Sequence, residues 1–348
     1  MISACILGCS GPVLTEAEKA FFADAKPWGF ILFRRNVETP EQVARLVRDL
    51  RETVGREDAP VLVDQEGGRV QRLTQPHWPK YPPARAFARL FHNDPQFRRE
   101  FVRLGARLMA ADLQRLGINV DCVPVLDVPQ PGAHDIIGDR AYAEDPATIA
   151  SLGRAAAEGL IAGGVLPVMK HIPGHGRAMA DSHQDLPVVD TDRRTLEEID
   201  FAPFRANTDC PMAMSAHVVY TAIDRKRPAT LSRKVIRAIR RDIGFDGLLM
   251  TDDLSMKALS GTFEDRAKAA VDAGCDVVLH CNGDPAEMEG VLAGCGKLKG
   301  KARRRADAAL ARLPKDVEPF DEAAARARFV EAFGGKIEDA KAGPKVGE

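Results

Sequence analysis

Short runs of apolar residues recur along the chain, and most are continuous rather than alternating with polar residues. The eight runs are SACILG at 3–8, GFILFR at 29–34, PVLVD at 60–64, INVDCVPVLD at 118–127, VLPVMKH at 165–171, PMAMSAH at 211–217, GLLMTD at 247–252 and CDVVLHC at 275–281. A continuous apolar run is typical of a strand that is covered on both faces, as in a parallel sheet. The pattern therefore predicts eight buried strands.

The segments between these runs have helical periodicity and helix-start signals. Thr39 is the expected N-cap of one helix, with Pro40 at its first position. Thr195 and Glu198 match a capping box, and Ser232 is an expected N-cap. Alternating strands and helices of this number predict an α/β fold, a (β/α)8 barrel. A doubly wound sheet is the alternative, but no glycine-rich phosphate loop follows the first strand.

The chain after residue 300 departs from this pattern. It contains two amphipathic stretches that end before a Gly- and Lys-containing tail. We therefore predict a catalytic barrel over 1–300, C-terminal helices packed on the barrel over 301–335, and a flexible tail over 336–348.

Composition excludes several classes of protein. The 348 residues carry 49 Lys+Arg and 50 Asp+Glu, for a formal net charge of -1, and 45% are hydrophobic. A disordered chain would be less hydrophobic and more charged. The chain lacks the basic excess of most nucleic-acid binders, and no apolar run approaches the ~18 residues of a membrane span. We expect neither nucleic acid nor membrane as a partner, and we interpret the cluster Arg303, Arg304 and Arg305 as a solvated helix face.

Seven cysteines are present without any CxxC spacing. The pattern indicates buried free thiols in a reducing compartment rather than a zinc ribbon or a redox pair. Cys9 ends a stretch similar to a lipoprotein cleavage site, but no Lys or Arg precedes it, so we interpret the stretch as a strand. The expectation is a cytoplasmic monomer with no metal and no cofactor.

Charged and polar residues gather where the predicted strands end. In parallel barrels the carboxyl ends of the strands form the active-site face. Charged side chains there cost free energy unless they are paired or hydrated, so their recurrence predicts a polar cup at one mouth of the barrel. The residues are Asp64, Asp127, Arg140 on the loop after it, Lys170, His171, His217, Asp252 and Asp253.

The connection KHIPGHGRAMADSHQDLP at 170–187 is long and lacks helical periodicity. Long loops without their own structure are often functional. This one holds His171, His175 and His183 together with Asp181. Its glycines and prolines favour a mobile catalytic lid.

Three functions fit these residues. Glycoside hydrolysis would use Asp252 as the carboxylate and the Asp181–His183 pair as the proton donor, because imidazole titrates near neutrality. A metal-dependent hydrolase is an alternative, although no H-x-H or H-E-x-x-H spacing occurs; its ligands would be His171, His175, His183, His217 and Asp252. A sugar-binding barrel without turnover is the third.

Several segments resemble glycoside hydrolase family 3, specifically the bacterial single-domain β-N-acetylglucosaminidases of peptidoglycan recycling. They occur in family order with family-like spacing, and the combination of KHIPGHG with DSH is the most specific. The segments are VDQEGGRVQR at 63–72, PVLDV at 124–128, IGDR at 137–140, KHIPGHG at 170–176, DSH at 181–183, MSAH at 214–217 and MTDDLSM at 250–256.

The resemblance implies a retaining exo-β-N-acetylglucosaminidase that acts through a covalent glycosyl-enzyme. It implies that Asp252 is the nucleophile and that His183, paired with Asp181, is the acid/base. The implied substrate is N-acetylglucosaminyl-1,6-anhydro-N-acetylmuramic acid, with or without its stem peptide. The residues implied to bind the terminal sugar are Asp64, Arg72, Arg140, Lys170 and His171.

Other polar residues receive structural interpretations. The turn at Gly67-Gly68 is expected to direct Glu66 toward neighbouring backbone, and Arg69 is expected to be structural. His175 is expected to shape its loop by hydrogen bonding. Trp28 and Trp78 are expected to pack in the core.

Overall fold

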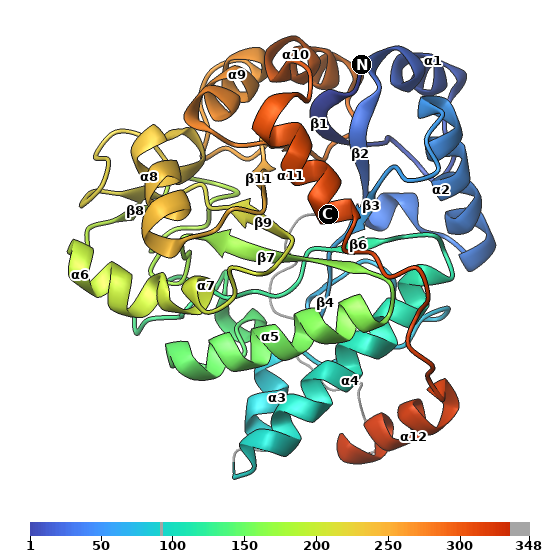
Figure 1. Ribbon diagram of the computed structural model, residues 1–348, viewed down its shortest axis with the longest axis vertical. Helices are drawn as coiled ribbons and strands as arrows, with labels where there is room; N and C mark the ends of the chain where they lie inside the picture. Colours follow the sequence, from blue (N-terminus) through green and yellow to red (C-terminus); the bar gives the residue numbers. More distant parts are fainter. Residues whose placement is uncertain (91–92, 335–348) are drawn as a thin grey trace.

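The computed structural model describes residues 1–90 and 93–334, and eight of its strands form a closed parallel barrel (Figure 1). The predicted (β/α)8 fold and all eight predicted strands are confirmed. Each strand pairs with the next along the chain, and the last pairs with the first. The barrel strands are β1 (Ser3–Gly8), β2 (Pro27–Leu32), β3 (Val61–Val63), β6 (Val120–Asp121), β7 (Leu166–Ile172), β9 (Met212–Ser215), β11 (Leu248–Asp253) and β12 (Val277–His280).

Helices cover the outside of the barrel, with α4 and α5 packed side by side (Figure 1). Two short strand pairs, β4 (Gln65–Gly67) with β5 (Val70–Gln71) and β8 (Val188–Val189) with β10 (Val219–Tyr220), lie in the loops. The helices are α1 (Glu16–Ala25), α2 (Pro40–Val54), α3 (Ala84–Leu90), α4 (Pro95–Gln114), α5 (Pro146–Ala162), α6 (Arg193–Thr195), α7 (Ala202–Arg205), α8 (Arg233–Ala238), α9 (Phe263–Ala273), α10 (Pro285–Cys295), α11 (Gly300–Leu310) and α12 (Glu322–Ala332).

The strands are apolar throughout because both of their faces are buried. In β1, Ala4 and Ile6 belong to a cluster inside the barrel, whereas Cys5 and Leu7 belong to the outer cluster under the helices. This alternation is the two-residue period of a strand. All seven cysteines are buried and free.

Two of the three helix N-caps predicted from the sequence are confirmed. Thr39 accepts a hydrogen bond from the Gln42 backbone N–H and starts α2, and Ser232 caps α8. The capping box at Thr195 is wrong. Asp192 is the N-cap, and its carboxylate accepts from the Thr195 backbone N–H at 3.0 Å. A carboxylate three residues earlier satisfies this helix start, so Thr195 falls inside the helical segment.

The helix α11 closes the amino end of the barrel. Leu298, Ala306 and Ala309 belong to the same cluster as the inward-facing strand residues. Arg305 is not a solvated residue as predicted, because it pairs with Asp276 at 3.0 Å and with Asp246. The domain boundary at 300 stays a prediction, and the predicted tail at 336–348 lies outside the described residues. No helix in the described part of the chain is long and apolar enough to cross a membrane.

Asp276, at the amino end of the barrel, forms ion pairs with two arginines from different segments of the chain. Its carboxylate binds Arg240 at 2.7 Å and Arg305 at 3.0 Å, and its side chain is only 4% exposed. Replacing Asp276 by Ala removes the carboxylate partner of the partly buried Arg240 and leaves Arg305 only its pair with Asp246, so we expect the free energy of unfolding to fall by about 3 kcal/mol. Urea denaturation checks this. Arg303→Ala is the control, since its exposed pair with Asp307 is worth less than about 1 kcal/mol. Equal losses in the two variants would contradict the assignment.

Candidate active site

A cavity of about 320 Å³ opens at the carboxyl end of the barrel, where the sequence predicts a polar cup. Asp181 is not among its lining residues but contacts one of them, His183. The structure therefore brings the predicted residues together from five different segments. Those that line the cavity are Asp64, Arg72, Arg140, Lys170, His171, His183 and Asp252.

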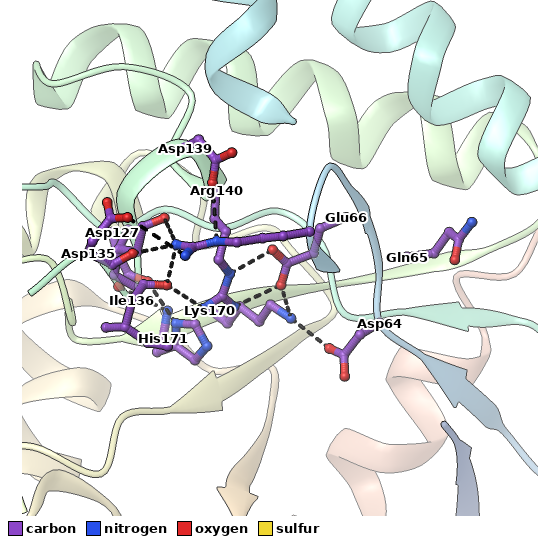
Figure 2. Close-up of polar contacts among 12 residues, drawn as sticks. Asp64, Gln65, Glu66, Asp127, Asp135, Ile136, Asp139, Arg140, Lys170 and His171 are labelled. Atoms are coloured by element: carbon purple, nitrogen blue, oxygen red, sulfur yellow. Dashed lines mark hydrogen bonds and ion pairs between the residues drawn. The ribbon is translucent and has the colours of Figure 1, made fainter. Parts of the chain in front are cut away.

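Lys170 is the centre of a buried ionic network (Figure 2). Its Nζ lies 2.7 Å from Asp64 Oδ1 and 2.6 Å from Glu66 Oε1. Asp64 also pairs with Arg72 at 3.2 Å, and Glu66 accepts from Arg140 through both of its oxygens at 2.8 Å. The network contains three cations and two carboxylates, and each cation pairs with at least one of the carboxylates.

Glu66 is the residue of this network that the sequence interpretation misplaced. It does not point at neighbouring backbone but joins Lys170 to Arg140. Asp64 and Glu66 lie two positions apart in extended chain, so their side chains share one side, and Gln65 points away from them (Figure 2). That two-residue spacing was the signal that could have identified Glu66.

Mutual attraction sets the ionisation of the network. Burial alone would disfavour the charged forms, but Lys170 and Arg72 hold the pKa of Asp64 far below its ordinary value. Burial also disfavours the charged form of Glu66, but Arg140 and Lys170 lower its pKa to about 2. The two carboxylates in turn raise the pKa of Lys170 despite its burial. All of these groups are therefore charged at neutral pH.

Asp127 fixes the start of the long loop after β7. Its Oδ1 accepts from the backbone N–H groups of His171 at 3.1 Å and His175 at 2.6 Å, and its Oδ2 lies 2.7 Å from His171 Nδ1. Since a carboxylate only accepts, the Nδ1 of His171 carries the proton and its Nε2 is left to other partners. Burial, followed by the neighbouring His171, lowers the pKa of His175 to about 4, so its ring is neutral.

The same loop carries the predicted proton donor. Nδ1 and the backbone N–H of His183 lie 2.8 Å and 2.9 Å from Asp181 Oδ1. These hydrogen bonds lower the pKa of Asp181 although burial opposes them. Asp181 is therefore ionised and holds the proton on Nδ1 of His183. Nε2 is the ring nitrogen of His183 that does not contact Asp181.

The base of the loop is anchored by buried contacts. Tyr220 donates to the Gly174 carbonyl at 2.6 Å, and Arg177 pairs with Asp200 at 2.7 Å. A Cβ on Gly176 would lie 2.1 Å from the carbonyl oxygen of Val128, so only glycine fits this approach. The predicted mobility of the loop stays a prediction.

Asp252 is the penultimate residue of β11 and lines the same cavity as His183. Its Oδ1 accepts from the Asp253 backbone N–H at 2.8 Å. Burial would raise its pKa, but His171 and the other nearby imidazoles lower it, so Asp252 is ionised at neutral pH. Asp253 instead accepts from Ser255 and from the Cys281 backbone N–H, which gives it a structural position.

The remaining candidates take supporting positions. His217 contacts Thr230 at 2.8 Å and the Asp253 carbonyl at 3.0 Å. Trp28 and Trp78 are buried in the core, as predicted. Among residues 1–90 and 93–334, no group of three or more His, Cys, Asp or Glu side chains is arranged to hold a metal ion.

Known sequences resemble this chain over most of its length. The family model described as "Glycosyl hydrolase family 3 N terminal domain" matches residues 12–315. A β-hexosaminidase of Thiobacillus denitrificans is 39% identical over 287 residues, covering 80% of this chain and 77% of that protein. A β-hexosaminidase of Chromobacterium violaceum is 36% identical over 356 residues, covering 97% and 96%.

Solved structures agree with these sequence matches. NagZ from Neisseria gonorrhoeae, in complex with N-trifluoroacetyl-D-glucosamine, superposes with a TM-score of 0.85 at 31% identity. The match covers 95% of this chain and 98% of that one. A glycoside hydrolase family 3 β-N-acetylglucosaminidase from Paenibacillus has a TM-score of 0.82 at 30% identity, covering 94% of this chain and 67% of that one.

Because of the ionic network, we expect the free energy of unfolding to fall as the pH becomes acidic. The folded-state pKa of Glu66 is lowered from 4.5 to about 2, so the unfolded chain binds a proton first as the pH falls. The stabilisation is present above about pH 5 and is lost toward pH 2, with a magnitude of about 3 kcal/mol.

Lys170→Met removes the cation shared by the two carboxylates, so we expect lower stability at pH 7 and a shallower loss on acidification. Urea denaturation between pH 7 and about pH 3 measures both effects. Lys301→Met, on an exposed side chain of α11, is the control. Parallel pH profiles for wild type and Lys170→Met would refute the role of the network.

Proposed function

The chain belongs to glycosyl hydrolase family 3, and we propose that it is a retaining exo-β-N-acetylglucosaminidase that acts on muropeptides through a covalent glycosyl-enzyme. Its β-hexosaminidase relatives identify the coarser activity: the chain is a glycoside hydrolase, a β-N-acetylhexosaminidase. One observation carries the finer proposal. His183 and the ionised Asp252 line the same small cavity, and Asp181 holds the proton on Nδ1 of His183.

The buried end of the cavity has the chemistry to bind one terminal sugar. Asp64, Arg72, Arg140, Lys170 and His171 offer charged donors and acceptors for hydroxyl and N-acetyl groups. Charge-assisted hydrogen bonds of this kind are strong where water is excluded. A cavity of about 320 Å³ is at the small end of ligand sites, which supports removal of a single terminal residue.

The proposed reaction has two steps. Asp252 attacks the anomeric carbon while His183 Nε2 donates its proton to the departing glycosidic oxygen, so the carbon–oxygen bond breaks as the Asp252 ester forms. The neutral His183 then takes a proton from water, whose oxygen displaces Asp252 from the same carbon. Two inversions retain the configuration. Asp181 stabilises the imidazolium form in which His183 begins the reaction.

We propose N-acetylglucosaminyl-1,6-anhydro-N-acetylmuramic acid, with or without a stem peptide, as the substrate. Similarity over nearly the full length of Neisseria NagZ, whose structure holds an N-acylated glucosamine analogue, supports the N-acetylglucosamine part. We also propose that the protein is a cytoplasmic monomer. Its seven buried free cysteines are typical of a reducing compartment.

The nucleophile can be trapped directly. A fluorinated N-acetylglucosaminyl substrate analogue slows release of the ester more than its formation, so mass spectrometry should find one added sugar on the peptide containing Asp252. Asp252→Ala should fold normally, form no adduct and lose several orders of magnitude in release of 4-nitrophenol from the nitrophenyl N-acetyl-β-glucosaminide. An adduct on another residue, or wild-type rates in the variant, would overturn the assignment.

The acid role of His183 predicts a dependence on the leaving group. His183→Ala should lower kcat/KM by about 10²–10⁴-fold for poor leaving groups and much less for activated ones, because only poor leaving groups need a proton. A series of aryl glycosides of differing phenol acidity measures this. Equal losses across the series would contradict the role.

A further inference from the structure

Lys257 is an exposed cation at the mouth of the cavity. Its side chain lines the cavity, between Met256 and Ala258, which are both only 5% exposed. Among residues 1–90 and 93–334, no ion pair or side-chain hydrogen bond involves Lys257. The mechanism above does not use it.

The backbone around Lys257 is fixed to the end of β11. The Met256 N–H donates to the Asp253 carbonyl at 3.2 Å, and the Leu259 N–H donates to the Met256 carbonyl at 3.2 Å. Arg266 also donates to the Leu254 carbonyl at 2.7 Å. Lys257 therefore extends from an ordered turn, so little backbone entropy is lost when it binds a ligand.

The same turn contacts the loop that carries the proton donor. The Ala258 N–H donates to the Ser182 carbonyl at 3.3 Å. Lys257 precedes Ala258 in the sequence and His183 follows Ser182, and both Lys257 and His183 line the cavity. The departing oxygen must lie within hydrogen-bond distance of His183 Nε2, so the leaving group lies on the same side as Lys257.

Burial distinguishes the two ends of the cavity. The Lys170 side chain is 2% exposed and that of Arg140 is 7% exposed, whereas the His183 side chain is 38% exposed. The deep cations are already matched by Asp64 and Glu66, and Arg35 donates to the Cys9 and Cys281 carbonyls. Lys257 thus differs from the deep cations in having no carboxylate partner among residues 1–90 and 93–334.

We propose that Lys257 binds a carboxylate on the leaving group and so favours substrates with an acidic aglycone. This inference rests on the proposed glycosidase function and extends it to the leaving-group side of the site. A lysine ammonium is a compact charge with three donors, which suits a carboxylate whose position varies. The muramic acid and peptide parts of a muropeptide carry such carboxylates.

A matched pair of substrates tests the proposal. We would compare kcat/KM for 4-nitrophenyl N-acetyl-β-glucosaminide derivatives with a carboxylate or a neutral carboxamide at ring position 3. The ratio of the two values in each variant, divided by the wild-type ratio, cancels their different intrinsic reactivity. Lys257→Gln should lower this preference for the carboxylate by about two- to fivefold, the range of an exposed ion pair. Lys257→Glu should lower it further, and Lys257→Arg should retain it.

Two controls separate this effect from general charge. Lys301→Glu makes the same charge change at the opposite, amino end of the barrel and should leave the ratio unchanged. Added salt should reduce the preference in wild type and not in Lys257→Gln. An unchanged ratio in both Lys257→Gln and Lys257→Glu would overturn the proposal while leaving the glycosidase function intact. Failure of wild type to hydrolyse either substrate would overturn both.

Discussion

The ammonium group of Lys170, shared between Asp64 and Glu66, is the interaction on which the site depends. Moving any one of these charges out of water alone would cost several kcal/mol. The barrel makes their burial possible because Asp64 just after β3 and Glu66 in β4 lie 2.7 Å and 2.6 Å from Lys170 in β7. Arg72 and Arg140 complete the balance, each on its own carboxylate. A polar sugar can then be bound in a site that excludes bulk water.

The two ends of the barrel solve opposite physical problems. The amino end is closed by α11, whose Ala306 and Ala309 extend the inner apolar core. The carboxyl end cannot be apolar, since it must bind a sugar and stabilise developing charge. Asp64, Lys170 and Asp252 lie in or next to barrel strands, which limits how far these charges can move. The apolar closure below and the ionic network above therefore belong to one continuous stack of inward-facing side chains.

The proposed acid/base His183 is more exposed than the residues proposed to bind the sugar, such as Lys170 and Arg140. Asp127, Tyr220 and the Arg177–Asp200 pair fix the base of the loop after β7, but the His183 side chain remains 38% exposed near its tip. This gradient fits a reaction in which the sugar is bound rigidly and the acid/base meets leaving groups and water in turn. The exposure of Lys257 beside the same loop is part of that gradient.

The sequence by itself determined the strands, the barrel fold and most of the charged and imidazole side chains that line the cavity. A strand buried on both faces must be continuously apolar, so a charge at its end is conspicuous, as at Asp64, Lys170 and Asp252. The two-residue spacing of Asp64 and Glu66 also implies that both side chains share one side, and the Gly67-Gly68 turn after them does not change this. The sequence did not determine the N-cap at Asp192, because two overlapping capping patterns compete there.

Only the tertiary structure decided which charges pair. Closure of the barrel through β12 and β1, the Lys170 contact with both carboxylates, and the Arg305–Asp276 pair join residues far apart in the sequence. The local sequence pattern indicates whether a side chain is buried or hydrated, because this environment depends on the chemistry of the side chain and of its immediate neighbours. The local sequence pattern does not identify the partner of a charged side chain, because that partner is set by distances across the barrel that no local periodicity encodes.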